Sequence, residues 1–329
     1  MKRKKLILIL IVALILSVFT AGCGQRELIE DEKTVTMGLL AGPTGMGAAK
    51  LMDEGLDLGE NAKLEFKIYT APDQISADII NGSLDIAAMP TNLAAVLYNR
   101  TEGGVLMGAV NTLGTLYVLS GEETQIDSIS DLAGKTIYSS GQGATPEYIL
   151  RYILDNNGLN PDEDVNIRFY QEHAEAATQF SQDKGNVVVL PEPFVTSTLM
   201  NMDGVKTVLD LTVEWEKSTQ GTSLPMGCVS IRKEFALEYP EALSYILEKY
   251  EESIDYVNQN PVQAAALIVE QGILPQEKIA ENAIGGSNIV YIKATEARES
   301  LEAYYKILFE FNPGSVGGAL PDDEFYYSE

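Results

Sequence analysis

The sequence predicts an α/β fold built from two successive units. Short runs rich in β-branched residues alternate with helical stretches, an alternation typical of sheets with largely parallel strands. It begins near residue 34, restarts near residue 116 and gives way to long helices. We therefore expect one unit over 34–115, a second over 116–222, and a helical return over 223–329 to the first lobe. The crossings near 110–118 and 220–228 would form the hinge of a two-lobed molecule.

In the first unit, each of three predicted strands is followed by a helix. The second helix ends at Asn81-Gly82, a typical helix stop. A long apolar stretch with two internal glycines closes the unit. The strands are expected at 35–40, 64–70 and 84–88. The first two helices begin near 48 and 73, a third follows Asn92 and runs through Tyr98, and the apolar stretch is 105–119.

The second unit repeats this alternation, and helices follow it. From Cys228 onward we predict that the chain turns helical, because apolar residues recur at helical spacing on one face, and that it ends in a turn-rich segment, 312–323. The predicted elements of the second unit are helices at 127–132, 147–156, 173–182 and up to Asn201, and strands at 135–138, 165–170, 187–190 and 205–211. The final helices are expected at 240–258, 261–271 and 294–311.

The N-terminal 22 residues read as a secretory signal. A basic head, Lys2 to Lys5, precedes an apolar run that ends at Phe19. About 14 residues at 1.5 Å each cover about 21 Å, too short for the ~30 Å hydrocarbon core. The small residues before Cys23 resemble a bacterial lipobox, which implies a lipid on Cys23 and an extracytoplasmic chain anchored to the cell membrane. An uncleaved anchor helix is the alternative. Residues 23–33 would be a tether.

Composition excludes several classes of function. A 45% apolar chain with 22% charged residues can build a full core, and its formal charge of −25 opposes binding to nucleic acid. With Cys23 assigned to the lipid, Cys228 has no disulfide partner. The single histidine, His173, cannot form a His-rich metal site, and we interpret it as a surface or hinge-side residue. Trp215 either packs locally or stacks on a flat ligand.

Two strand–helix junctions of the first unit carry unusual turn chemistry. Ligands of parallel sheets bind beyond the carboxyl ends of the strands, where helices begin. At the first junction, glycines would let the backbone approach a ligand, and Thr44 could cap the helix. At the second, Pro90 fixes the bend, and Thr91 and Asn92 offer uncharged hydrogen-bonding groups. Tyr69, at the end of a strand, is a further candidate for stacking.

The second unit has two junctions of the same kind. In one, Thr145 is the expected N-cap and Pro146 the first helical residue. In the other, Glu192 stands between two prolines, where its carboxylate either caps the helix or contacts a ligand. If the lobes face one another, all four junctions point into one cleft. We expect that cleft to hold one carboxylate and no histidine, a poor set for acid–base catalysis.

Several short segments together carry a family resemblance. The segments that carry it are Asn81 to Ala87, Ile129 to Lys135, Pro191-Glu192-Pro193, Glu252 to Asp255 with Asn260-Pro261, and Gly317 to Pro321. As a set they resemble the substrate-binding lipoproteins of ABC importers, in the nitrate, sulfonate and pyrimidine-precursor branch. The resemblance implies a type II periplasmic-binding-protein fold, a two-lobed flytrap. The ligand loops it implies comprise Pro43, Thr44, Gly45, Met46, Met89, Thr91, Asn92, Gly143, Ala144, Thr145 and Glu192.

The resemblance implies a receptor that captures a small organic solute and delivers it to a membrane permease driven by a cytoplasmic ATPase. No cofactor or metal is expected, and the chain would act as a monomer. Because no cluster of arginines marks the loops, a neutral, aromatic or singly charged solute is favoured over a multiply charged anion. The alternatives are a lipoprotein that senses a ligand for a receptor kinase, and an enzyme on the same fold.

Overall fold

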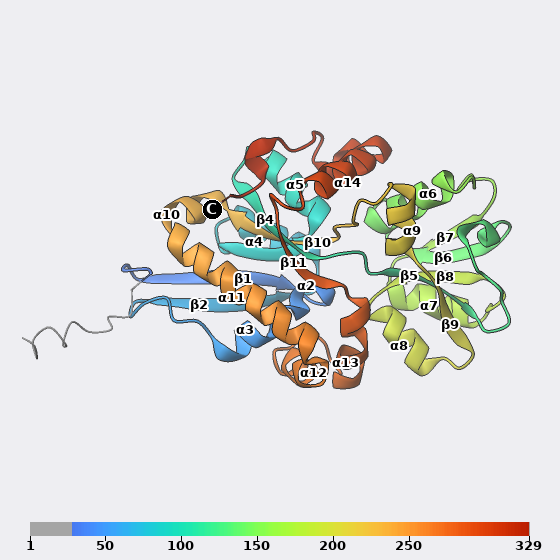
Figure 1. The fold of residues 1–329 in the computed structure, drawn as a ribbon, viewed down its shortest axis with the longest axis horizontal. Helices are drawn as coiled ribbons and strands as arrows, with labels where there is room; N and C mark the ends of the chain where they lie inside the picture. The colour runs from blue at the N-terminus through green and yellow to red at the C-terminus, as the bar shows by residue number, and fades with distance from the viewer. Residues whose placement is uncertain (1–27, 329) are drawn as a thin grey trace, which may run out of the picture.

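Two β-sheets lie side by side along the long axis of the molecule (Figure 1). The computed structural model describes residues 28–328, so the expected signal peptide and Cys23 lie outside the described residues. The first sheet, in the order β11-β4-β10-β3-β1-β2, consists of β1 (Lys33–Leu40), β2 (Ala62–Tyr69), β3 (Ile86–Pro90), β4 (Val105–Thr112), β10 (Gly227–Arg232) and β11 (Ile289–Lys293). The second, in the order β7-β6-β8-β5-β9, consists of β5 (Leu116–Gly121), β6 (Thr136–Ser140), β7 (Asn166–Tyr170), β8 (Val187–Pro191) and β9 (Val205–Asp210).

Helices cover the faces of both sheets (Figure 1). In the first half of the chain they are α2 (Pro43–Met46), α3 (Ala49–Glu54), α4 (Pro72–Ile80), α5 (Thr91–Arg100), η1 (Ile129–Leu132) and α6 (Thr145–Asn156). Then follow α7 (His173–Ser181), α8 (Phe194–Asn201), α9 (Leu211–Ser218), α10 (Lys233–Glu238), α11 (Pro240–Gln259), α12 (Pro261–Glu270), α13 (Glu277–Gly286), α14 (Arg298–Phe311), η2 (Pro313–Val316) and η3 (Asp323–Phe325). The predicted α/β alternation is confirmed, with boundaries within a few residues through most of the two units.

Each sheet combines parallel pairs with antiparallel insertions. β1 pairs in parallel with β2 and β3, and β6 pairs in parallel with β7 and β8. β10 runs antiparallel between β3 and β4, and β5 runs antiparallel between β8 and β9. β10 and β5 therefore occupy interior positions in their sheets, although each strand directly follows a crossing from the other sheet.

The predicted turn to helices after Cys228 is present, but the prediction missed two strands. Cys228 lies in β10, and β11 follows α13 further along the chain. From Cys228 to Ile231 every residue of β10 is fully buried, so the strand lacks the alternation that marks a half-exposed strand. α9, which follows β9, and α13 also escaped the prediction. The apolar stretch 105–119 proves to be two strands, β4 and β5, that belong to different sheets.

The chain crosses between the sheets twice, between β4 and β5 over 113–115 and between β9 and β10. We propose that 34–115 and 223–329 form one lobe and 116–222 the other. α14 nevertheless packs against the second unit, since Tyr304 lies edge-on to Trp215 with ring centroids 6.2 Å apart. Trp215 is fully buried, so it packs locally and offers no stacking platform.

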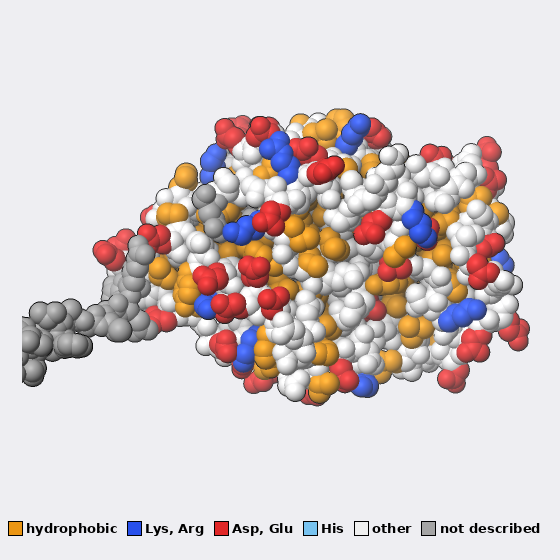
Figure 2. All heavy atoms as spheres, viewed as in Figure 1, with side chains coloured by type: hydrophobic (Ala, Val, Ile, Leu, Met, Phe, Trp, Pro, Cys, Tyr) orange, Lys and Arg blue, Asp and Glu red, His pale blue; other side chains and the backbone are white. Residues whose placement is uncertain are grey.

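The surface is acidic, with Asp and Glu side chains spread over the face shown in Figure 2. None of the helices within residues 28–328 combines the length and apolar character that crossing a bilayer requires. Within the expected tether, Ile29 is only 1% exposed, and its backbone N–H donates to Leu58 O at 3.0 Å. The end of the expected tether that the structure describes is therefore packed against the folded chain.

Candidate functional site

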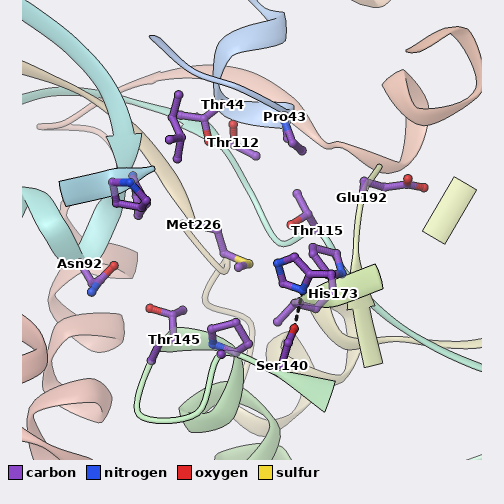
Figure 3. Close-up of a pocket in the computed structure, with 18 of the residues that line it drawn as sticks. Pro43, Thr44, Asn92, Thr112, Thr115, Ser140, Thr145, His173, Glu192 and Met226 are labelled. Atoms are coloured by element: carbon purple, nitrogen blue, oxygen red, sulfur yellow. Dashed lines mark hydrogen bonds between the residues drawn. The ribbon is translucent and has the colours of Figure 1, made fainter. Parts of the chain in front are cut away.

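A cavity of about 510 Å³ lies between the two sheets and is lined from both sides (Figure 3). Its volume falls in the range of about 300–1,000 Å³ that is typical of small-molecule sites. The lining comes from the carboxyl ends of β1 and β3 in the first sheet and of β6, β7 and β8 in the second. The predicted convergence of the strand–helix junctions on one cleft is thus present in the structure.

The first wall of the cavity contains no titratable side chain. Pro43 and Thr44 line it after β1, and Pro90 and Asn92 line it after β3. The turn after β1 depends on Gly42, whose φ of 101° is a conformation that glycine adopts easily. Gly42, rather than Thr44, is the N-cap of α2, so the Thr44 hydroxyl is not used as a cap. Asn92 donates from Nδ2 to Ser315 O at 3.2 Å, which leaves its Oδ1 as an acceptor.

The second wall contains a hydrogen-bonded serine–histidine pair. Ser140 ends β6 and is 2% exposed, and His173 begins α7. The Ser140 hydroxyl forms a short hydrogen bond with Nδ1 of His173, drawn as a dashed line in Figure 3. Burial lowers the pKa of His173 below 6.5, while the neighbouring Glu172 acts in the opposite direction. The ring is therefore neutral at pH 7, and its two nitrogens offer one donor and one acceptor.

The Glu192 side chain caps the first turn of α8 from the position before Pro193, which is the N-cap residue. Its carboxylate accepts hydrogen bonds from the Thr196 backbone N–H at 3.1 Å and the Thr196 hydroxyl at 3.0 Å, at the start of α8. In Figure 3 the carboxylate points away from the centre of the cavity. Burial raises the pKa of Glu192, and the two bonds from Thr196 partly oppose that rise. We expected Glu192 either to cap the helix or to contact a ligand, and the geometry shows the capping role.

Half of the residues predicted to contact a ligand line the cavity. They come from all four junctions. These residues are Pro43, Thr44, Asn92, Ala144, Thr145 and Glu192. Thr145 is the first residue of α6, and Ala144 is its N-cap, one position earlier than expected.

The other predicted residues lie behind the wall. Met46, Met89 and Thr91 have no exposed surface, because they pack under the turns that they follow or precede. Tyr69 is 8% exposed, and its hydroxyl donates to Asp78 Oδ2 at 2.5 Å, so it is not available for stacking. Gly45 is a buried residue of α2, and Gly143 stands next to the cavity residues without lining the cavity.

The expectation that the cleft lacks a histidine is wrong. His173 lines the cavity, as do Ser140, Thr112, Thr115 and Met226, none of which was predicted. The signal for His173 was present in the sequence: it begins a helix directly after a strand, as the four junction segments do. Thr115 and Met226 lie on the crossings between the sheets, where no motif marks them.

The lining of the cavity includes no lysine or arginine. Five prolines contribute to its apolar lining: Pro43, Pro72, Pro90, Pro146 and Pro191. Three titratable residues line it, Glu172, His173 and Glu192, and all three belong to the second wall. The cavity therefore presents apolar surface, uncharged hydrogen-bonding groups and two carboxylates, without a lysine or arginine that could neutralise a strong anion.

Comparison with protein families shows the family to which the chain belongs. A family model described as Menaquinone biosynthesis matches residues 50–310, and the chain belongs to this family. A curated relative, the putative binding protein YtlA of Bacillus subtilis strain 168, is 22% identical over 181 residues. The match covers 53% of this chain and 52% of YtlA, so the chain spans about half the length of that relative.

Solved structures share the fold. An ABC transporter structure from Parabacteroides distasonis matches with a TM-score of 0.77 and 22% identity, covering 90% of this chain and 99% of the other. The aliphatic sulphonate binding protein SsuA of Escherichia coli matches with a TM-score of 0.69 and 16% identity, covering 90% of this chain and 92% of SsuA. The nitrate-binding protein NrtA of Synechocystis PCC 6803 matches with a TM-score of 0.59 and 13% identity, covering 86% of this chain and 82% of NrtA. These likenesses confirm the two-lobed type II periplasmic-binding-protein fold.

Proposed function

We propose that this member of the family is the solute-binding component of an ABC importer and holds a small organic solute between its lobes. The observation that carries the proposal is the cavity of about 510 Å³, whose walls come from the ends of strands in both sheets. Shared fold with an ABC transporter structure and with sulfonate- and nitrate-binding proteins supports it. A solute that contacts both walls stabilises the closed state by its differential affinity for that state.

The chemistry of the cavity favours a neutral, aromatic or singly charged solute. Its lining provides hydroxyls, two amides, a neutral imidazole and two carboxylates, but no lysine or arginine. A multiply charged anion would lose its hydration without gaining an ion pair, which is costly in a buried site. The proposed contacts are Pro43, Thr44, Asn92, Ala144, Thr145 and His173, and Glu192 supports the wall as a helix cap.

Outside the described residues, we propose a lipid on Cys23 that holds the mature chain at the extracytoplasmic face of the cell membrane. The loaded chain would dock as a monomer on a permease whose cytoplasmic ATPase provides the energy. An acidic surface (formal charge −25 for the whole chain) supports small solutes over nucleic acid as the ligand.

A second candidate is catalysis on a bound solute. The Ser140–His173 pair in the cavity and the family's description favour it. A neutral buried imidazole can accept a proton from a bound molecule. The two candidates differ in the fate of the ligand: a binding protein releases it unchanged, whereas an enzyme converts it.

A thermal-shift screen tests the proposal. Residues 24–329 are melted with sulfonates, nitrate, pyrimidines, amino acids and vitamins. A solute at a hundred times its Kd stabilises the fold by about 2.7 kcal/mol, a readable rise in Tm. One clear organic hit that is recovered unchanged supports the binding proposal. Recovery in altered form supports the enzyme, and stabilisation by none of these compounds contradicts the binding proposal for the classes tested.

A further inference from the structure

A short C-terminal segment is attached to the first wall of the cavity. This segment, residues 312–316, follows α14 and includes η2; we call it the strap. Asn92 donates to Ser315 O at 3.2 Å, and Asn99, two turns further along α5, donates to Val316 O at 2.8 Å. Two side chains of the helix that carries Asn92 therefore hold the strap.

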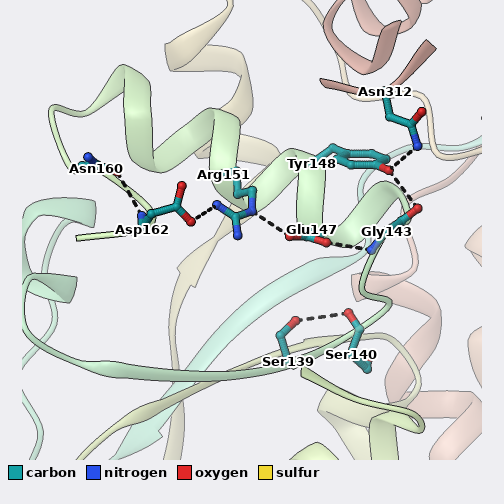
Figure 4. Close-up of polar contacts among 9 residues, drawn as sticks. All are labelled: Ser139, Ser140, Gly143, Glu147, Tyr148, Arg151, Asn160, Asp162 and Asn312. Carbon is teal, nitrogen blue, oxygen red and sulfur yellow. Dashed lines mark hydrogen bonds and ion pairs between the residues drawn. The ribbon is translucent and has the colours of Figure 1, made fainter. Parts of the chain in front are cut away.

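The strap also reaches the second wall through one tyrosine (Figure 4). Asn312 donates from Nδ2 to the Tyr148 hydroxyl at 3.1 Å. The same hydroxyl donates to Gly143 O at 2.9 Å. The Tyr148 ring stacks on Phe311, with centroids 5.7 Å apart and planes 18° apart. One hydroxyl group thus links the strap to the loop that contains Gly143.

Both backbone groups of Gly143 are held from behind the wall. Its N–H donates to Glu147 Oε2 at 2.7 Å, while its C=O accepts from Tyr148. Arg151 Nε binds the other oxygen of Glu147 at 2.7 Å. Gly143 has a φ of 73°, so this conformation depends on glycine as well as on the two bonds. The next two residues, Ala144 and Thr145, line the cavity.

We propose that the strap, Tyr148 and Glu147 form a positioning device that sets the loop of residues 141–146 against the first wall. The inference rests on the proposed function, because it treats this loop as part of the solute site. A displacement of the strap would remove one partner of the Tyr148 hydroxyl and loosen its hold on Gly143. A loop held in its bound geometry spares the solute the cost of ordering it.

Hydrogen–deuterium exchange of the intact chain without added solute tests the device. Tyr148→Phe removes the hydroxyl but keeps the ring on Phe311. We expect the amides of residues 141–145 to exchange about fivefold faster, as loss of a typical neutral hydrogen bond predicts. Asn312→Asp keeps the oxygen that accepts from Gly314 N at 3.0 Å but cannot donate to Tyr148. It alters an exposed residue and should accelerate the same amides.

Two comparisons separate positioning from general loss of structure. Tyr152→Phe, one turn along α6, removes a hydroxyl that does not bond to the loop and should leave exchange at 141–145 unchanged. The double variant Tyr148→Phe/Asn312→Asp should exchange no faster than Tyr148→Phe alone, because both changes break one chain of bonds.

The proposal is overturned if neither single variant accelerates the loop, if the double variant is additive, or if Tyr152→Phe accelerates the loop equally. Because the exchange experiment needs no solute, its outcome is independent of the thermal-shift screen. A screen without hits would contradict the proposed function and leave the measured coupling between strap and loop in place.

Discussion

The two walls of the cavity differ in chemistry although both are built from strand–helix junctions. The first wall, with Pro43, Thr44, Pro90 and Asn92, has no group that titrates. The second wall holds Glu172, His173 and Glu192. The difference indicates a division of roles: the first wall supplies shape and uncharged contacts, and the second makes the site sensitive to pH. The strap connects the two.

The largest effect is expected from filling the cavity at the uncharged wall. Thr44→Trp places a large ring in the cavity and should lower solute affinity more than about 100-fold, or about 2.7 kcal/mol. Thr34→Trp is a matched control, because Thr34 is exposed on β1 and away from the cavity. Calorimetric titration of a solute identified by screening checks both. Equal affinities in the two variants would mean that the solute binds elsewhere.

The next effect concerns the carboxylate of the second wall and separates stability from binding. Glu192→Ala removes the cap of α8 and should lower the free energy of unfolding by about 1–2 kcal/mol. Glu192→Gln keeps an acceptor oxygen and should lose less. We expect solute affinity to change less than about threefold in both, because the carboxylate bonds to Thr196. A large affinity loss with unchanged denaturation would instead make Glu192 a solute contact.

The pH dependence of the second wall comes next. Burial holds the pKa of His173 below 6.5, so the unfolded chain binds a proton at this residue more readily than the folded chain. Stability from this group is therefore present above pH 6.5 and is lost as the pH falls through the folded-state pKa. His173→Asn should abolish that contribution. Because His173 is the single histidine of the sequence, a difference between the two Tm–pH curves from 7.5 to 5 isolates it.

The smallest effect is expected at the mouth of the cavity. Glu172 lines the cavity but is exposed, so water and salt screen its charge. Glu172→Gln should change the affinity for a neutral solute by less than about twofold. Titrations at 0.05 and 0.5 M salt check this expectation. A strong change that disappears at high salt would show that charge at the mouth steers the solute.

Much of the fold followed from the sequence because its strands and helices alternate with clear punctuation. Asn81-Gly82 marks a helix end, and Pro191-Glu192-Pro193 marks the start of another helix. β10 escaped because it is buried on both faces and joins β3 and β4, which precede it by more than a hundred residues. No local pattern records such a partner.

The sequence predicted where the site lies more accurately than it predicted which side chains face the cavity. Junction chemistry located the cleft but could not tell Thr44, which faces it, from Met46, which packs beneath it. The orientation of each side chain depends on the exact start of the helix, and α2 and α6 each begin earlier than expected. His173 was not predicted to line the cleft, because a single histidine signals no metal site. Its position at the start of a helix that follows a strand is nevertheless the same as in the four predicted junctions.

Native mass spectrometry of the intact chain tests the central claim, that one small solute occupies the cavity between the two walls. The protein is analysed as the cell produces it, beside Thr44→Trp and Thr34→Trp. We predict one added mass, of a single organic molecule released unchanged, on the wild type and Thr34→Trp and none on Thr44→Trp. The same added mass on all three proteins, or none on the wild type after incubation with every screened solute, would contradict the account.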